Sequence, residues 1–366
     1  MLTPSLKPDF DDTLQRFVKW WNLEETDRPV LELPVRPGPF EVAARRPETL
    51  RERWMDPQWR VEAALADLQS RPYVAETLPV FMPDVGPDLT ATLLGADLEF
   101  GENTSWSHHP VRDVEEWQAV LERKPDFKNP YWQAIEKMTT LALERAGGEF
   151  LVGLPDLHGA YDMMVGLRGP EDLCIDLMEE PELVEKTALH MADIFNQAVM
   201  RAWTPLQAAG MPATTWTHFL HDGLAYVSSC DFWCLVSPEM ARRHVVATIE
   251  REAAPLERSI FHLDGPDALR HLDWLLQCDR IQAIQWVYGA GKGPATRWLD
   301  VYRKCLEAGK AIQVLAETPQ DLLALARELG SSGVWITLTR DLASVEQAED
   351  LLRSVEAGRL SVPVYR

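Results

Sequence analysis

The chain is poor in basic residues relative to acidic ones. Its 366 residues hold 36 Lys and Arg against 57 Asp and Glu, which gives a formal net charge of −21. DNA, RNA and anionic membranes are bound mainly by surplus positive charge. The composition therefore argues against nucleic acid or a membrane as a partner. It also disfavours a strongly anionic small substrate, unless arginines are gathered locally.

Several features that define other classes of protein are also missing. No apolar run approaches the ~18 residues that a transmembrane helix requires, and the first residues lack the basic-then-apolar layout of a signal peptide. The five cysteines are odd in number and form no CxxC pair. These absences predict reduced thiols in a cytoplasmic protein.

What the sequence does contain is an alternation of short apolar runs with longer stretches of helical periodicity. The runs expected to be strands are residues 30–35, 77–82, 150–155, 213–218, 259–264, 282–287, 311–316 and 334–339. This alternation predicts an α/β fold, a single (β/α)8 TIM barrel over residues 1–366 with an insertion at 83–148 after the second strand. A doubly wound open sheet is the alternative, but no GxGxxG motif follows an early strand.

Polar and aromatic side chains gather near the carboxyl ends of the expected strands. TIM barrels build their active sites at these ends. The candidate residues there are Arg36, Asp84, Asp156, His158, Trp216, His218, His262, Asp264, Trp286, Tyr288, Glu317 and Arg340. Trp216 and Trp286 are the two tryptophans expected to line a pocket.

The pair His262 and Asp264 is the most specific of these candidates. Residues two apart on a strand point to the same face, so both side chains can reach one point. With Glu317 they would form a nitrogen and oxygen site for zinc or another divalent metal. The same groups could instead act as general acids and bases without metal. A third interpretation is structural: Asp264 caps the following helix, and His262 bonds to a carbonyl.

The order of several segments resembles the uroporphyrinogen decarboxylase superfamily. The resemblance runs from about Asp27 to Gly358, through DRPVLELPVRPG, GLPDLHGAYDMMVGLRGPEDLCIDLMEEPELVEK, SCDFWCLVSPEMARR, FHLDGPDALRHLDWLL and WLDVYRKCLEAGKAI. It implies a (β/α)8 fold. It also implies one of two chemistries: cofactor-free decarboxylation of a tetrapyrrole, or zinc-dependent methyl transfer involving corrinoid proteins or thiols.

The chain departs from both branches of that family. LPVRPG replaces the arginine-rich motif of the decarboxylases and TLTRDL replaces a GHG-like segment, so few guanidinium groups remain for a tetrapyrrole with many carboxylates. In the methyltransferase branch an HxC pattern at the fifth strand supplies zinc ligands. Here the pattern reads HxD, and His262 and Asp264 carry over by position.

The first expected function is methyl transfer from a small substrate to a thiol or to a corrinoid, which a partner protein would carry. A metal would be held by His262, Asp264 and Glu317, and His158 would be the acid or base. The expected pocket residues are Trp216, His218, Trp286, Tyr288 and Arg340.

Two other functions remain open. One is decarboxylation of a smaller carboxylic acid, with Arg36 as the anchor and Asp84 or Asp156 as the proton donor. The other is a non-catalytic barrel that binds a corrinoid-like ligand or a protein. The substrate, the methyl acceptor and the oligomeric state do not follow from the sequence.

Overall fold

A seven-stranded sheet is the largest element of the computed structural model, which describes residues 2–42 and 46–358. Its strand order is β2-β1-β11-β10-β9-β8-β7. All neighbours are parallel except β1 and β2. The protein thus has a mixed α/β fold, as the alternation predicts. The strands are β1 (Val30–Pro34), β2 (Tyr73–Ala75), β7 (Ala225–Ser229), β8 (Arg258–Asp264), β9 (Ala283–Val287), β10 (Ala311–Ala316) and β11 (Val334–Leu338).

Two strand pairs lie outside this sheet. β3 (Val80–Phe81) pairs in parallel with β6 (Leu151–Val152), and β4 (Asp97–Phe100) pairs antiparallel with β5 (Ser105–His108). Single backbone hydrogen bonds link the segments beside β3 and β6 to other parts of the chain. The Glu76 N–H donates to the Leu31 carbonyl in β1, and the Leu154 N–H donates to the Thr214 carbonyl. Over the described residues the strands nevertheless form separate sheets, and a continuous closed barrel is not detected.

The expected strands agree unevenly with the observed ones. Four of them match β8, β9, β10 and β11 closely, and 30–35 matches β1. The runs 77–82 and 150–155 shorten to the two-residue strands β3 and β6. The run 213–218 is not a strand, because only Ala213 forms a bridge, to His221. The strand beside β8 is instead β7, which was not expected from the sequence, and neither was β2.

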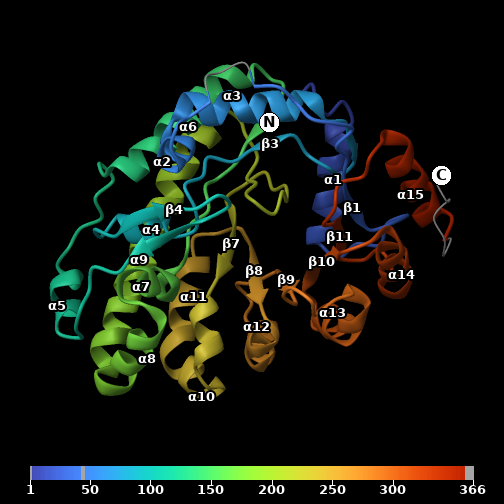
Figure 1. The fold of residues 1–366 in the computed structure, drawn as a ribbon. Helices are drawn as coiled ribbons and strands as arrows, with labels where there is room; N and C mark the ends of the chain where they lie inside the picture. The colour runs from blue at the N-terminus through green and yellow to red at the C-terminus, as the bar shows by residue number, and fades with distance from the viewer. Residues whose placement is uncertain (1, 43–45, 359–366) are drawn as a thin grey trace.

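Helices surround the strands, which lie toward the middle of the molecule (Figure 1). No helix among the described residues is both long and apolar enough to cross a membrane. The α-helices are α1 (Phe10–Trp21), α2 (Leu50–Met55), α3 (Pro57–Ser70), α4 (Leu89–Thr92), α5 (Glu116–Leu121), α6 (Pro130–Ala146), α7 (Ala160–Arg168), α8 (Pro170–Glu179), α9 (Pro181–Ala208), α10 (Pro238–Met240), α11 (Val246–Ala253), α12 (Leu272–Gln277), α13 (Leu299–Glu307), α14 (Pro319–Leu329) and α15 (Val345–Glu356). Shorter helical turns are η1 (Asp231–Leu235), η2 (Ala241–Val245), η3 (Pro266–His271) and η4 (Ala295–Trp298).

Local sequence signals explain where several helices begin and end. Ser237 and Thr318 accept hydrogen bonds from the N–H groups of Met240 and Asp321, so each caps a helix that starts with proline. α14 ends just before Gly330, whose φ of 72° favours glycine. The segment 83–148, expected as an insertion, contains α4, the β4–β5 hairpin, α5 and all of α6.

Side chains alternate between the two faces of the parallel strands. Trp286 of β9 points toward the helices, where its ring meets that of Trp298 in η4 at 5.3 Å. Its neighbour Gln285 therefore faces the opposite, inner side. Gln285 and Gln313 are only 3% and 2% exposed, although both are polar. The inner face thus carries polar groups that must find partners within the protein.

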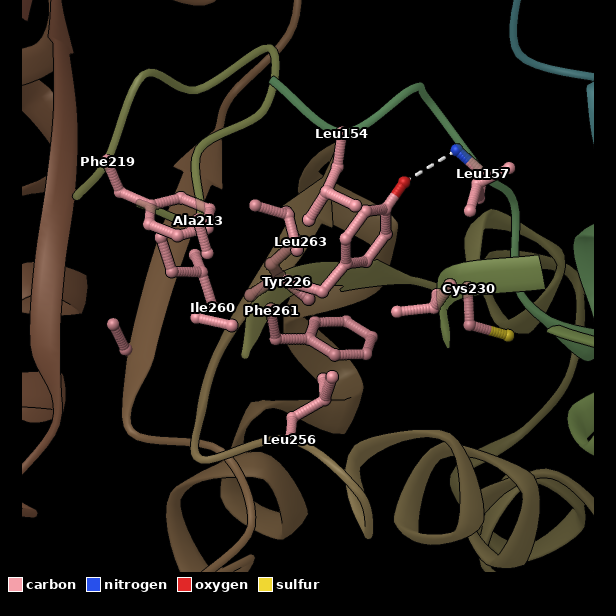
Figure 2. Packing of buried hydrophobic residues seen from close by; sticks show 14 of the residues in the cluster. Leu154, Leu157, Ala213, Phe219, Tyr226, Cys230, Leu256, Ile260, Phe261 and Leu263 are labelled. Carbon is pink, nitrogen blue, oxygen red and sulfur yellow. Dashed lines mark hydrogen bonds between the residues drawn. The ribbon is translucent and has the colours of Figure 1, made fainter. Parts of the chain in front are cut away.

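Tyr226 of β7 connects the apolar interior to the loop after β6. Figure 2 shows it among buried side chains that include Leu154, Ile260 and Phe261. Its hydroxyl accepts a hydrogen bond from Leu157 N–H at 2.7 Å and donates one to the Pro155 carbonyl at 2.6 Å. Tyr226 therefore fixes the loop that carries Asp156 and His158.

Replacing Tyr226 by Phe is expected to destabilise the protein by about 1–3 kcal/mol, because a buried N–H and a buried carbonyl lose their partner. Urea unfolding followed by circular dichroism measures the effect. The matched control is Tyr302→Phe, since the buried Tyr302 hydroxyl has no hydrogen-bond partner in the described structure. Equal destabilisation by both substitutions would contradict the role given to Tyr226.

Candidate metal centre

Three acidic or imidazole side chains converge where β7 and β8 end. His262 and Asp264 share one face of β8, and Asp231 begins η1 just after β7. The two strands are neighbours, with Ser229 opposite His262. One ligand atom from each of Asp231, His262 and Asp264 lies within 4.8 Å of the others. We refer to these residues as the Asp231–His262–Asp264 cluster.

Most of the possible ligand atoms in the cluster form no hydrogen bond with other described residues. The Nδ1 atom of His262 bonds to Gln285 Oε1 at 2.5 Å, whereas its Nε2 and the carboxylates of Asp231 and Asp264 have no hydrogen-bond partner within the described residues. The capping interpretation of Asp264 is wrong, because η3 has Gly265 at its N-cap and no side-chain cap bond. One imidazole nitrogen and two carboxylates suit zinc and similar divalent ions.

Asp162 of α7 holds Asp231 in position. Its carboxylate accepts hydrogen bonds from the Ser229 hydroxyl and from the N–H groups of Asp231 and Phe232, at 3.0–3.1 Å. Asp231 is open to solvent on one side, but surrounding protein removes much of its hydration. This loss, together with the charge of Asp162, raises the pKa of Asp231 to about 6, against the opposing effect of His262. A bound cation would remove that charge repulsion.

His158 and Asp156 lie near the cluster on the loop held by Tyr226. Burial raises the pKa of Asp156, and the charge of His158 only partly offsets it. Burial alone would lower the pKa of His158, but Asp156, Asp162 and Asp88 outweigh it and leave the pKa raised. His158 Nδ1 is 3.9 Å from Asp88 Oδ1. The surrounding carboxylates therefore favour the protonated form of His158.

Trp216 and His218 lie on the segment that was expected to be a strand. The ring of Trp216 meets the His262 ring edge-on, with centroids 5.1 Å apart. His218 has a positive φ of 54° and bonds through Nδ1 to Glu32 at 2.8 Å. Burial would lower the pKa of His218, yet this bond to Glu32 leaves it raised.

Three expected site residues lie elsewhere. Glu317, the expected third metal ligand, accepts a hydrogen bond from the Tyr288 hydroxyl at 3.2 Å and is not in the cluster. Trp286 and Tyr288 both pack against Trp298 rather than lining the inner face. Their positions differ by an even number of residues, so they share the face opposite Gln285.

The two expected arginines and Asp84 are not part of the Asp231–His262–Asp264 cluster either. Arg36 contacts Asp67 at 2.7 Å and Asp341 at 3.0 Å, and these carboxylates outweigh burial and raise its pKa. Arg340 is exposed. Asp84 accepts a hydrogen bond from Gly86 N–H at 2.6 Å, and its charge reaches Asp156.

Asp231 and Asp162 were not identified from the sequence. The signal for Asp231 is present, although it is short: AYVSS contains the strand-forming pair Tyr226 and Val227, and Asp231 follows its last residue by two. Assigning the fourth strand to 213–218 hid it. Asp162 lies inside a helix, and nothing in the surrounding sequence indicates that it bonds to another loop.

The fold of this chain is similar to that of a solved enzyme structure. A search of solved structures finds a methyltransferase from Methanosarcina mazei, with a TM-score of 0.59 and 13% sequence identity. The match covers 94% of this chain and 98% of that one. At this identity the likeness shows a common fold and no more. No protein-family model and no curated protein matches the sequence.

Proposed function

We propose that this protein is a methyltransferase whose divalent metal, zinc or a similar ion, is held by Asp231, His262 and Asp264. The observation that carries the proposal is the convergence of one possible ligand atom from each of these three residues within 4.8 Å. The fold shared with a methyltransferase supports the reaction class. We further propose a single TIM-barrel domain of the uroporphyrinogen decarboxylase type over residues 1–366, with the segment 83–148 as its insertion.

The residues around the cluster fit the demands of methyl transfer. A bound divalent ion would lower the pKa of a thiol or polarise a methyl-bearing substrate. When the methyl group leaves, the electron pair of the broken bond stays on the donor atom, and the acceptor supplies the pair for the new bond. His158 would protonate the donor atom. Trp216 limits rotation of the His262 ring by edge-on contact.

The charge around the cluster selects among substrates. Neighbouring carboxylates raise the pKa values of several groups at the site. The pKa of Asp156 is raised by Asp84 and Asp88, and that of His158 by Asp156, Asp162 and Asp88. The pKa of Asp231 is raised by Asp162. Such a surplus of carboxylates favours a neutral or cationic methyl donor over an anionic one. The acceptor would be a small thiol or a corrinoid carried by a partner protein.

Methyl transfer from a panel of alcohol, amine and thioether donors to cob(I)alamin or a thiol tests the proposal, with and without added zinc. The expected result is zinc-dependent transfer that falls about a thousandfold in His262→Ala, because a metal contributes several kcal/mol to such barriers. Glu317→Gln is the matched control and should retain activity, since Glu317 lies outside the cluster. Equal transfer by wild type and His262→Ala would overturn the proposal.

Decarboxylation of a small carboxylic acid is the second candidate. The raised pKa of the buried Asp156 favours it, because a protonated carboxyl can serve as the acid. The expected anchor is a weakness, since Arg36 is already bound to two carboxylates. Release of carbon dioxide by metal-free protein would make this candidate the leading one.

A further inference from the structure

A row of hydrogen-bonded side chains crosses the inner face of the sheet from His262 to Glu32. His262 bonds to Gln285, Gln285 donates to Gln313 at 2.8 Å, and Gln313 donates to Thr337 at 3.0 Å. Thr337 then donates to Glu32 at 2.9 Å. Each residue comes from a different strand: β8, β9, β10, β11 and β1. We call this row the Glu32–His262 chain.

Strand register explains why the row is continuous. His262 stands opposite Gln285, Gln285 opposite Gln313, and Thr337 opposite Glu32. Only the step from Gln313 to Thr337 is diagonal, since Gln313 stands opposite Trp335. Two buried glutamines are costly in a sheet interior unless their amides are paired. Both amides here are paired along the row.

The carboxylate of Glu32 sets the direction of every bond in the row. An ionised carboxylate can only accept, so the Thr337 hydroxyl must donate to it and accept from the Gln313 amide. The Gln313 oxygen is then left to accept from Gln285, and the Gln285 oxygen to accept from His262. The other Glu32 oxygen is hydrogen-bonded to His218 Nδ1 at 2.8 Å.

We propose that Glu32 is a positioning residue that acts through Thr337, Gln313 and Gln285 to hold the His262 proton on Nδ1. The lone pair of the neutral ring is thereby kept on Nε2, the nitrogen that forms no hydrogen bond with the described residues. Its use as a metal ligand rests on the proposed function, whereas the position of the proton does not. In a reversed row the Thr337 hydroxyl would donate to Gln313, and its oxygen would face the Glu32 carboxylate with no proton between them.

Nitrogen NMR of histidine-labelled, metal-free protein at about pH 8.5 tests this, because that pH lies above the ordinary histidine pKa of ~6.5. His262 signals are assigned by their loss in His262→Asn. Wild type should show a protonated Nδ1 and an unprotonated Nε2. Glu32→Gln should populate the opposite tautomer, since an amide can donate to Thr337.

Thr337→Val breaks the row but keeps the Glu32–His218 pair. If Glu32→Gln folds poorly because that pair is disturbed, Thr337→Val still tests the role of the row. Both variants should weaken zinc binding about 10- to 100-fold, as lost outer partners of metal ligands do. The matched control is Thr339→Val, because Thr339 is exposed just after β11 and donates to the Ala316 carbonyl rather than to the row; it should behave as wild type.

Two results would overturn the inference: a wild-type His262 protonated on Nε2, or an unchanged tautomer in both Glu32→Gln and Thr337→Val. If the tautomer shifts as expected but wild type binds no zinc, the inference stands and the proposed metal-dependent function fails. The two proposals are therefore tested separately.

Discussion

Asp231→Asn is expected to prevent tight zinc binding, whereas the wild-type protein should bind about one equivalent. Asp231 supplies one of three converging ligand atoms, and an amide oxygen is a much weaker ligand than a carboxylate. The loss should exceed the about 10- to 100-fold that follows removal of an outer-shell partner. Competition with a chromogenic chelator measures the affinity, and elemental analysis measures the stoichiometry.

The sharpest control is Glu317→Gln, which makes the same kind of change in a carboxylate outside the cluster. It should bind zinc as wild type does. Wild-type affinity in Asp231→Asn together with loss in Glu317→Gln would mean that the ion is held elsewhere. Asp267→Asn, in the exposed turn after β8, controls for the loss of one negative charge.

Glu252→Gln is expected to stabilise the protein at pH 8 and to change little near pH 4.5. Glu252 is 1% exposed, and its Oε1 accepts a bond from Ala160 N–H while Oε2 has no partner in the described structure. Burial raises the pKa of Glu252 from 4.5 to about 8, although the bond from Ala160 opposes the shift.

The sign of the effect follows from proton binding. Between pH 4.5 and 8 the unfolded chain has lost this proton while the folded protein keeps it, so the wild-type free energy of unfolding falls as pH rises. The neutral amide of the Glu252→Gln variant would carry no such penalty. The gain at pH 8 is on the order of 4 kcal/mol, from ~1.4 kcal/mol per pKa unit.

Urea unfolding at pH 5, 6.5 and 8 measures this difference. Glu250→Gln is the matched control, because Glu250 lies on the same helix and is exposed. A constant difference between Glu252→Gln and wild type across these pH values would show that Glu252 does not carry the pH dependence.

Part of the site could be predicted from the sequence because the pattern of β8 is typical of a strand. SIFHLD alternates apolar and polar residues at its end, so His262 and Asp264 were expected on one face, and they lie there. Glu317, expected as the third ligand, is not among the three converging residues, because position at the end of a strand does not determine toward which neighbouring loop a side chain turns. Asp231 reaches the cluster through a turn fixed by Asp162, a contact between distant segments.

Hydrophobicity alone could not predict which side chains of the parallel strands point to the inner face of the sheet and which point to the helices. Strands of a parallel sheet are buried on both faces and lack clear alternation, so Trp286 gave no sign of which side it occupies. The sequence did indicate the face for Gln285 and Gln313. A glutamine in the middle of an apolar strand indicates an internal polar network, and in this protein both mark the inner face.

The pairing of β1 with β11 has a consequence for synthesis of the protein. Glu32 and Thr337 are 305 residues apart in the chain, and Val30 stands opposite Trp335. At about 5–20 residues per second, roughly 15–60 s pass between translation of the two strands. During that time one edge of β1 has no strand to pair with and is open to association with other chains. A nascent chain released before β11 should therefore depend on chaperones.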